Sequence, residues 1–121
     1  MWRDAGRSPG LLEIDRDRVA RLGAPAAARQ AISYLIRDGG PDGFWIHLDA
    51  DVFDQSLMRA VDDPRPDGLR WDEAVSAISA AIGSGRAVGL QVAIYNPDID
   101  PDGANGRGRA AAIRAALAAN L

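Results

Sequence analysis

The spacing of apolar residues divides the chain into helices and short strands. From Ala24 to Arg37 the apolar side chains recur every three or four residues, as on an amphipathic helix, with Pro25 in the first turn and two glycines behind the end. Residues 44–48 and 87–95 are almost continuously apolar, which is typical of buried strands. In chain order, the pattern predicts a short strand over 11–14, a helix over 24–37, a strand over 44–48, a helix over 71–82, a strand over 87–95 and a helix over 109–121.

Helices that alternate with short apolar strands are typical of βαβ units and of a parallel sheet covered on both faces. We therefore expect an α/β fold. The sheet has few strands, so its edges would be left without partners, and we expect the fold to be incomplete. Residues 1–10 are polar and contain glycine and proline, and they are expected to form a loop or a disordered end.

The composition excludes several classes of chemistry. The chain has 121 residues, of which 47% are hydrophobic and 26% charged, as in a small domain or a piece of a larger one. A net charge of −3 gives no reason to expect nucleic acid or an anionic membrane as a partner. There is no cysteine and no lysine, which excludes disulfides, thiolate catalysis and Schiff-base chemistry. No apolar run could span a bilayer, and the start lacks the apolar core of a signal peptide, so we expect a cytoplasmic protein.

The most informative motif follows the first buried strand. It places Asp49, Asp51 and Asp54 in the spacing D-x-D-x-x-D. Alternate side chains on a strand point the same way, so the carboxylates of Asp49 and Asp51 are expected to lie close together and to repel each other. A divalent cation would relieve this repulsion, and carboxylate oxygens suit hard cations. We therefore predict that Asp49 and Asp51 bind a metal ion; the alternative is a solvated acidic strand end in which Asp54 caps a turn.

Other polar residues lie close to these carboxylates. Asp49, Asp51 and Asn96 all follow predicted parallel strands, and open sheets of this kind bind ligands beyond the carboxyl ends of their strands. His47 is expected on the same strand face as Asp49. There it could support a metal ligand or move a proton, or it could be a hydrogen-bonded residue of the core. The loop over 52–70 is long enough to expect a function for it.

A second acidic cluster lies near the C-terminus. Residues 98–103 read DIDPDG and are similar to the opening of a calcium-binding loop. Such a loop ends in a bidentate acid, but Arg109 stands at that position, and Pro101 interrupts the loop. These two departures disfavour a calcium site.

Three segments resemble signatures of the arginase, agmatinase and formiminoglutamase family, the ureohydrolases. Residues 47–54 resemble the family's motif S/H-x-D-x-D-x-x-D-P, residues 60–69 its loop that ends in a Gly-Gly-Leu-type turn, and residues 89–97 its late strand that ends in Asn-Pro. Order and spacing agree from about residue 10 to the C-terminus. The resemblance implies a three-layer α/β/α fold with a parallel sheet, of which residues 1–121 would be the C-terminal portion.

The resemblance also implies a function and assigns roles to residues. The family uses two Mn²⁺ ions and a bridging hydroxide to hydrolyse linear C–N bonds of guanidino or amidino substrates. Asp49 looks like the carboxylate that bridges the two metals, Asp51 like a ligand of one of them, and Asp54 like a supporting acid, with His47 as a further candidate for support. The family's other ligands, a Gly-Gly-x-His histidine and a D-x-H-x-D cluster, have no counterpart before Asp49. We therefore expect the chain to be inactive alone.

One departure concerns the substrate, and two alternative functions stay open. Ile94 occupies the position of the glutamate that pairs with the substrate guanidinium in arginases, so arginine and agmatine are disfavoured as substrates. The chain could instead be a degenerate, non-catalytic fragment that serves as an assembly module, with bare sheet edges that favour a homo-oligomer. The third interpretation is a haloacid-dehalogenase-like phosphatase, in which Asp49 would be the nucleophile and Asp51 the acid/base, but the chain lacks a glycine-rich phosphate loop.

Overall fold

Two parallel strands form the sheet of the structure, a computed structural model that describes residues 10–38 and 40–120. Strand β1 (Phe44–Asp49) pairs with strand β2 (Ala87–Ala93), and the register runs from Trp45 opposite Gly89 to Asp49 opposite Ala93. Both strands were expected from their apolar runs. Because the pairing is parallel, their carboxyl ends lie at the same edge of the sheet.

Four helices accompany the strands in the described residues: α1 (Arg16–Leu22), α2 (Ala24–Leu35), α3 (Trp71–Gly83) and α4 (Ala104–Ala118). Helix α2 packs against α3, and α3 packs against α4. The start of α3 is stabilised by Glu73, whose carboxylate accepts a hydrogen bond from the backbone nitrogen of Arg70 and pairs with both terminal nitrogens of Arg16 at 3.1 Å. That ion pair attaches α1 to α3.

Two details of the sequence-based prediction are wrong. Residues 11–14 form no strand, because no described strand pairs with them; the chain instead enters α1, where the side chain of Asp15 caps the backbone nitrogen of Arg18 at 2.9 Å. Helix α4 begins at Ala104 rather than at Arg109, since residues before it stabilise its first turn. The prediction for residues 1–9 lies outside the described residues.

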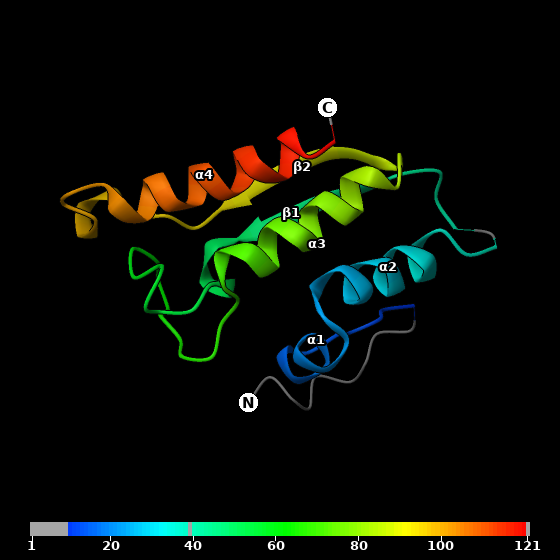
Figure 1. The fold of residues 1–121 in the computed structure, drawn as a ribbon, viewed down its shortest axis with the longest axis horizontal. Coiled ribbons are helices and arrows are strands. Elements are labelled where there is room, and N and C mark those ends of the chain that lie inside the picture. The colour runs from blue at the N-terminus through cyan, green and yellow to red at the C-terminus, as the bar shows by residue number, and fades with distance from the viewer. Residues whose placement is uncertain (1–9, 39, 121) are drawn as a thin grey trace.

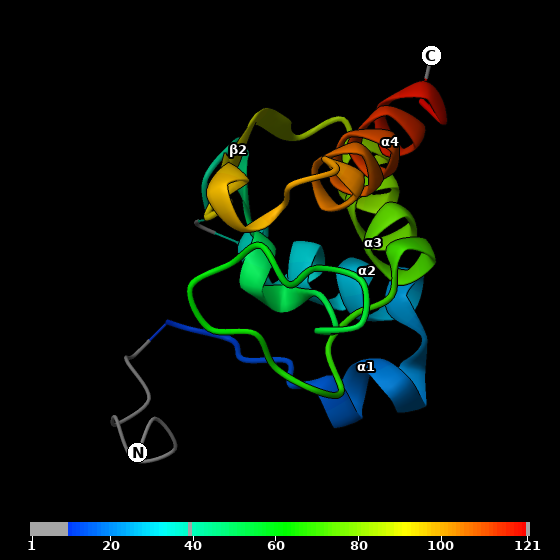
Figure 2. The same cartoon turned by 90° about the vertical axis from the view of Figure 1, so that its left-hand side faces the viewer.

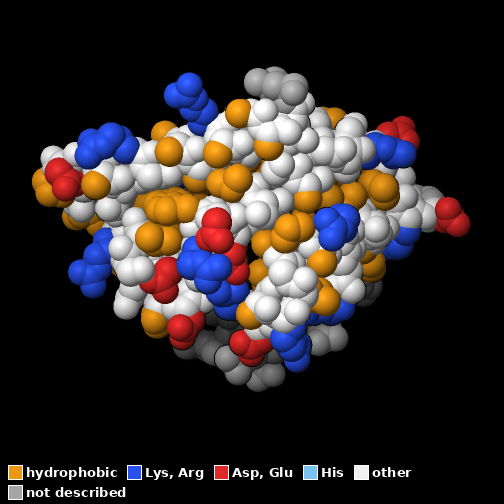
Figure 3. Space-filling view, in the orientation of Figure 1, with side chains coloured by type: hydrophobic (Ala, Val, Ile, Leu, Met, Phe, Trp, Pro, Cys, Tyr) orange, Lys and Arg blue, Asp and Glu red, His pale blue; other side chains and the backbone are white. Residues whose placement is uncertain are grey.

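The helices α3 and α4 cover one face of the sheet (Figures 1 and 2). The sheet contributes Ile46, Leu48, Leu90 and Val92 to the core, against Ile78 and Ala116 of these helices. On the other face Trp45 is 69% exposed, and Val88, at the register irregularity between the pairs Phe44–Ala87 and Trp45–Gly89, is 64% exposed. An α/β fold with an incomplete parallel sheet is therefore confirmed, and the described residues cover only one of its faces. Figure 3 shows the side with the helices, where hydrophobic and charged side chains are interspersed.

The long segment between β1 and α3 is part of the core. Phe53 and Met58 are its largest fully buried side chains, and Val61 is 4% exposed. The ring of Phe53 lies 4.4 Å from that of Trp71, centroid to centroid, and its backbone forms an isolated parallel bridge with Leu69. The segment is thus folded onto the sheet, which fixes the residues that follow β1 in space.

Candidate metal centre

Asp49 and Asp51 are brought together by a tight turn. Strand β1 ends at Asp49, and residues 50–52 form one turn of 3₁₀ helix. The Asp49 carboxylate caps this turn by accepting a hydrogen bond from the backbone nitrogen of Asp51 at 2.8 Å. The argument that both side chains alternate along one strand is therefore wrong, because Asp51 lies beyond the strand. The two residues are nonetheless adjacent at the carboxyl edge of the parallel sheet, where ligands bind in open α/β folds.

The surroundings of Asp51 are strongly negative. Partial burial raises the pKa of the Asp51 carboxyl, and the neighbouring carboxylates of Asp49, Asp62 and Asp63 raise it further. A hydrogen bond from the backbone nitrogen of Asp63 opposes this shift; it reaches Oδ1 of Asp51 at 3.5 Å. Ionisation of Asp51 is therefore harder than that of a free aspartate, and a cation at this place would be attracted electrostatically.

Asp54 holds its own loop in shape. Its carboxylate accepts hydrogen bonds from the hydroxyl and the backbone nitrogen of Ser56 and, at 3.3 Å, from the backbone nitrogen of Gly68. These bonds lower the pKa of Asp54, with the Ser56 hydroxyl as the largest cause. A Cβ at Gly68 would come within 2.4 Å of the Asp54 backbone nitrogen, so the close approach requires glycine. Asp54 thus supports the segment that follows Asp51.

His47 lies on the open face of the sheet. Its side chain is exposed, and its Nδ1 is 3.2 Å from Oε1 of Gln91 on the neighbouring strand. The interpretation of His47 as a core residue is therefore wrong. As part of β1 it lies two residues before Asp49, so the alternation of the strand places both on the same face.

The second acidic cluster stabilises the beginning of α4. Asp100 is only 6% exposed and accepts hydrogen bonds from the Tyr95 hydroxyl at 2.6 Å and from the backbone nitrogens of Asn105 and Gly106 at 3.1 and 2.9 Å. These bonds, led by that from Tyr95, lower the pKa of Asp100 and raise that of Tyr95. The carboxylate oxygens of Asp100 face helix amides, which agrees with the rejection of a calcium loop. Sequence analysis missed Tyr95 and Asn105, although an aspartate shortly before a helix is a usual capping signal.

Two of the predicted site residues have the chemistry of metal ligands. Asp49 and Asp51 offer hard oxygen donors in a negative environment, which suits a divalent cation such as Mn²⁺. Over residues 10–38 and 40–120, however, no group of three or more histidine, cysteine, aspartate or glutamate side chains is arranged to hold a metal ion. Further ligands would have to come from outside these residues.

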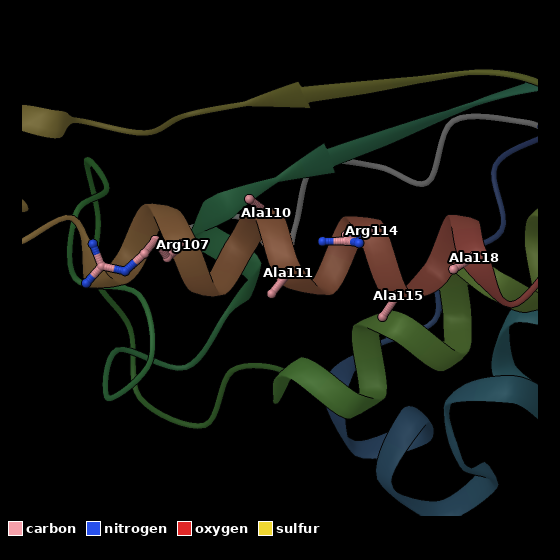
Figure 4. Close-up of a pocket in the computed structure, with 6 residues that line it drawn as sticks. All are labelled: Arg107, Ala110, Ala111, Arg114, Ala115 and Ala118. Atoms are coloured by element: carbon pink, nitrogen blue, oxygen red, sulfur yellow. The ribbon is translucent and has the colours of Figure 1, made fainter.

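A pocket of the described residues lies away from Asp49 and Asp51. It is an open groove of about 570 Å³ on the outer side of α4, as Figure 4 shows, and it is lined by Arg107, Ala110, Ala111, Arg114, Ala115 and Ala118. None of the predicted site residues lines this groove. Within the described part of the chain, no helix is long and apolar enough to cross a membrane.

Fold and site together define an α/β protein with acidic side chains at the carboxyl edge of a parallel sheet. The family model described as "Arginase family" matches residues 2–121. The chain belongs to the arginase family, and the resemblance drawn from its motifs is confirmed. This membership disfavours the phosphatase interpretation. No curated protein matches the chain.

Solved structures of the family share the fold. The chain is similar to an arginase from Bacillus subtilis, with a TM-score of 0.78, 21% identity and coverage of 89% of this chain and 37% of that one. For a formimidoylglutamase from Bacillus subtilis subsp. subtilis str. 168, the TM-score is 0.77 and the identity 23%, with coverage of 88% of this chain and 32% of that one. For a Trypanosoma cruzi formiminoglutamase with Mn²⁺, the TM-score is 0.73 and the identity 19%, with coverage of 85% of this chain and 34% of that one. The chain therefore spans about a third of the length of each of these proteins.

Proposed function

We propose that the chain is the C-terminal part of a Mn²⁺-dependent hydrolase of the arginase family, which acts on linear C–N bonds of a guanidino or amidino substrate. The acidic turn that joins Asp49 and Asp51 at the carboxyl edge of the sheet is the observation that carries this proposal. The family match and the Mn²⁺ in the Trypanosoma cruzi relative support it. The setting is proposed to be the cytoplasm.

In this proposal each acidic residue has a separate task. Asp49 and Asp51 are metal ligands, and Asp54 keeps the following loop in place through Ser56 and Gly68. His47, on the strand face of Asp49, is a candidate to support that ligand. A bound divalent ion lowers the pKa of its water and stabilises negative charge. Because the described residues supply only part of the ligand set, the chain alone is proposed to be inactive.

The substrate is proposed to differ from arginine and agmatine. Ile94 stands where the arginase resemblance places an acid, and its side chain packs against the hydrophobic core. An aliphatic side chain offers no charge to a guanidinium cation. A substrate whose cationic group is paired by residues outside this chain, or one without such a group, fits this position.

A second candidate function is a non-catalytic assembly module. The exposed apolar side chains of the sheet favour it, because Trp45 of β1 and Val88 of β2 are both more than half exposed. Large apolar side chains gathered on one surface commonly mark interaction sites, and a homo-oligomer would be the simplest assembly. Sedimentation of the purified chain distinguishes a monomer from such an oligomer.

Calorimetric titration of the full chain with Mn²⁺ tests the metal site. Asp49→Asn and Asp51→Asn each remove one negative charge with almost no change in shape, and each is expected to abolish binding. Asp42→Asn removes a charge two residues before the other end of β1 and should leave binding intact. Equal weakening in all three variants would contradict the assignment of Asp49 and Asp51 as ligands, whereas absence of binding by the wild-type chain would favour the non-catalytic fragment.

A further inference from the structure

Residues 59–63 form a short loop segment that ends next to Asp51. A side chain of α4 holds this segment in place. The Asn105 side chain accepts hydrogen bonds through Oδ1 from the backbone nitrogens of Arg59 at 2.7 Å and Ala60 at 3.0 Å. The backbone oxygen of Ala60 accepts in turn from the backbone nitrogen of Asn96 at 2.8 Å. One side chain of α4 and one backbone group beyond β2 therefore fix the same short piece of loop.

The position of Asn105 is itself fixed by a buried carboxylate. The Asp100 carboxylate accepts hydrogen bonds from the backbone nitrogens of Asn105 and Gly106 and from the hydroxyl of Tyr95. A Cβ at Gly106 would lie 2.6 Å from the Tyr95 hydroxyl oxygen, so this first turn of α4 is tightly packed. Because its backbone is anchored in this way, Asn105 presents its side-chain oxygen to the loop in a defined place.

The loop carries this constraint to Asp51. Ala60 and Val61 are 0% and 4% exposed, so the segment cannot shift without disturbing the core. Two residues after Val61, the backbone nitrogen of Asp63 donates to Oδ1 of Asp51, while the Asp63 carboxylate pairs with Arg65 at 2.7 Å. The backbone amide that faces Asp51 is thus placed by contacts that begin at Asn105.

We propose that Asn105 is a positioning residue for Asp51: it holds residues 59–63 so that the Asp63 amide orients the Asp51 carboxylate. The consequence for metal binding rests on the proposed function, whereas the effect on the loop does not. Asn105 touches neither a metal ion nor a substrate in this role. It acts through the loop.

The test compares asparagines at the two ends of one helix. Asn105→Ala removes the acceptor for two backbone nitrogens, whereas Asn105→Asp keeps an acceptor oxygen in the same place. Asn120→Ala is the matched control, because the Asn120 side chain lies just past α4 and donates to the backbone oxygens of Ser79 and Ala116, far from the loop. All variants are made in the full chain, and Asn105→Gln, which displaces the acceptor by one methylene, replaces Asn105→Ala if that variant does not fold.

Two measurements separate the outcomes. In Asn105→Ala, the ¹⁵N order parameters of the Asp62 and Asp63 amides should fall from the range of ordered backbone, about 0.85, to below about 0.6. The affinity for Mn²⁺, followed by titration with the metal alone, should weaken about tenfold or more, as when an outer partner of a metal ligand is lost. Asn105→Asp should restore both values, and Asn120→Ala should change neither.

Other results overturn the inference or the proposed function separately. An ordered loop in Asn105→Ala, or equal loss of Mn²⁺ affinity in Asn120→Ala, would show that Asn105 only stabilises the fold. If the wild-type chain does not bind Mn²⁺, this chain alone does not form the proposed metal site, and the order parameters still decide whether Asn105 positions the loop.

Discussion

Truncation of Phe53 to alanine tests whether the long segment between β1 and α3 belongs to the core. The side chain is 1% exposed and its ring stacks at a tilt on Trp71, with centroids 4.4 Å apart. Loss of a buried phenylalanine costs about 3–5 kcal/mol through lost burial and the cavity that remains. Native domains are stable by only about 5–15 kcal/mol, so this single change removes a large part of the free energy of unfolding.

Urea unfolding followed by circular dichroism measures this loss. Val52→Ala is the matched control, because the neighbouring side chain is 39% exposed and its truncation should change the free energy of unfolding by no more than about 0.5 kcal/mol. On heating, a loss of about 3 kcal/mol corresponds to a Tm lower by roughly 10 °C for a chain of this size. If Phe53→Ala and Val52→Ala unfold at the same urea concentration, the segment is not packed as described.

Two further predictions concern backbone space and pH. Gly68→Ala should destabilise by about 1–3 kcal/mol, since its Cβ would meet backbone atoms of Asp54 that cannot yield; a thermal melt equal to that of the wild type would refute the close approach. The folded-state pKa of Asp54 is lowered, so its contribution to stability is present above its unfolded pKa and is lost as the pH falls through the folded value. The folded-state pKa of Asp51 is raised, so its ionisation lowers stability above the folded pKa, and this cost is relieved as the pH falls through that value. At pH 7 Asp51→Asn should therefore melt no lower than the wild type and Asp54→Asn should melt lower, whereas the reverse order would contradict these pKa directions.

The site shows where local patterns stop being informative. The spacing of Asp49 and Asp51 after an apolar run was enough to place them at the end of a strand, and parallel pairing puts that end at the ligand-binding edge. The turn that joins them was not expected, because the alternation of a strand was assumed to continue to Asp51, whereas residues 50–52 form a 3₁₀ helix. The hydrogen bonds from Arg59 and Ala60 to Asn105 connect residues more than forty positions apart, and no local pattern indicates such a bond.

The sequence by itself determined the elements whose signal is periodic. Both strands and the helices α2 and α3 follow from apolar spacing, and the D-x-D-x-x-D motif with the late Asn-Pro strand was sufficient to indicate the arginase family. These features depend on neighbours within a few residues, so a linear pattern records them. Only the tertiary structure decided three features. The loop after β1 contributes to the hydrophobic core, Asp100 stabilises a first turn of α4 that begins before the expected start, and one face of the sheet is exposed in the described residues. Each of these features depends on contacts between side chains that are distant in the sequence. Burial and buried hydrogen bonds arise from such contacts and not from any one segment.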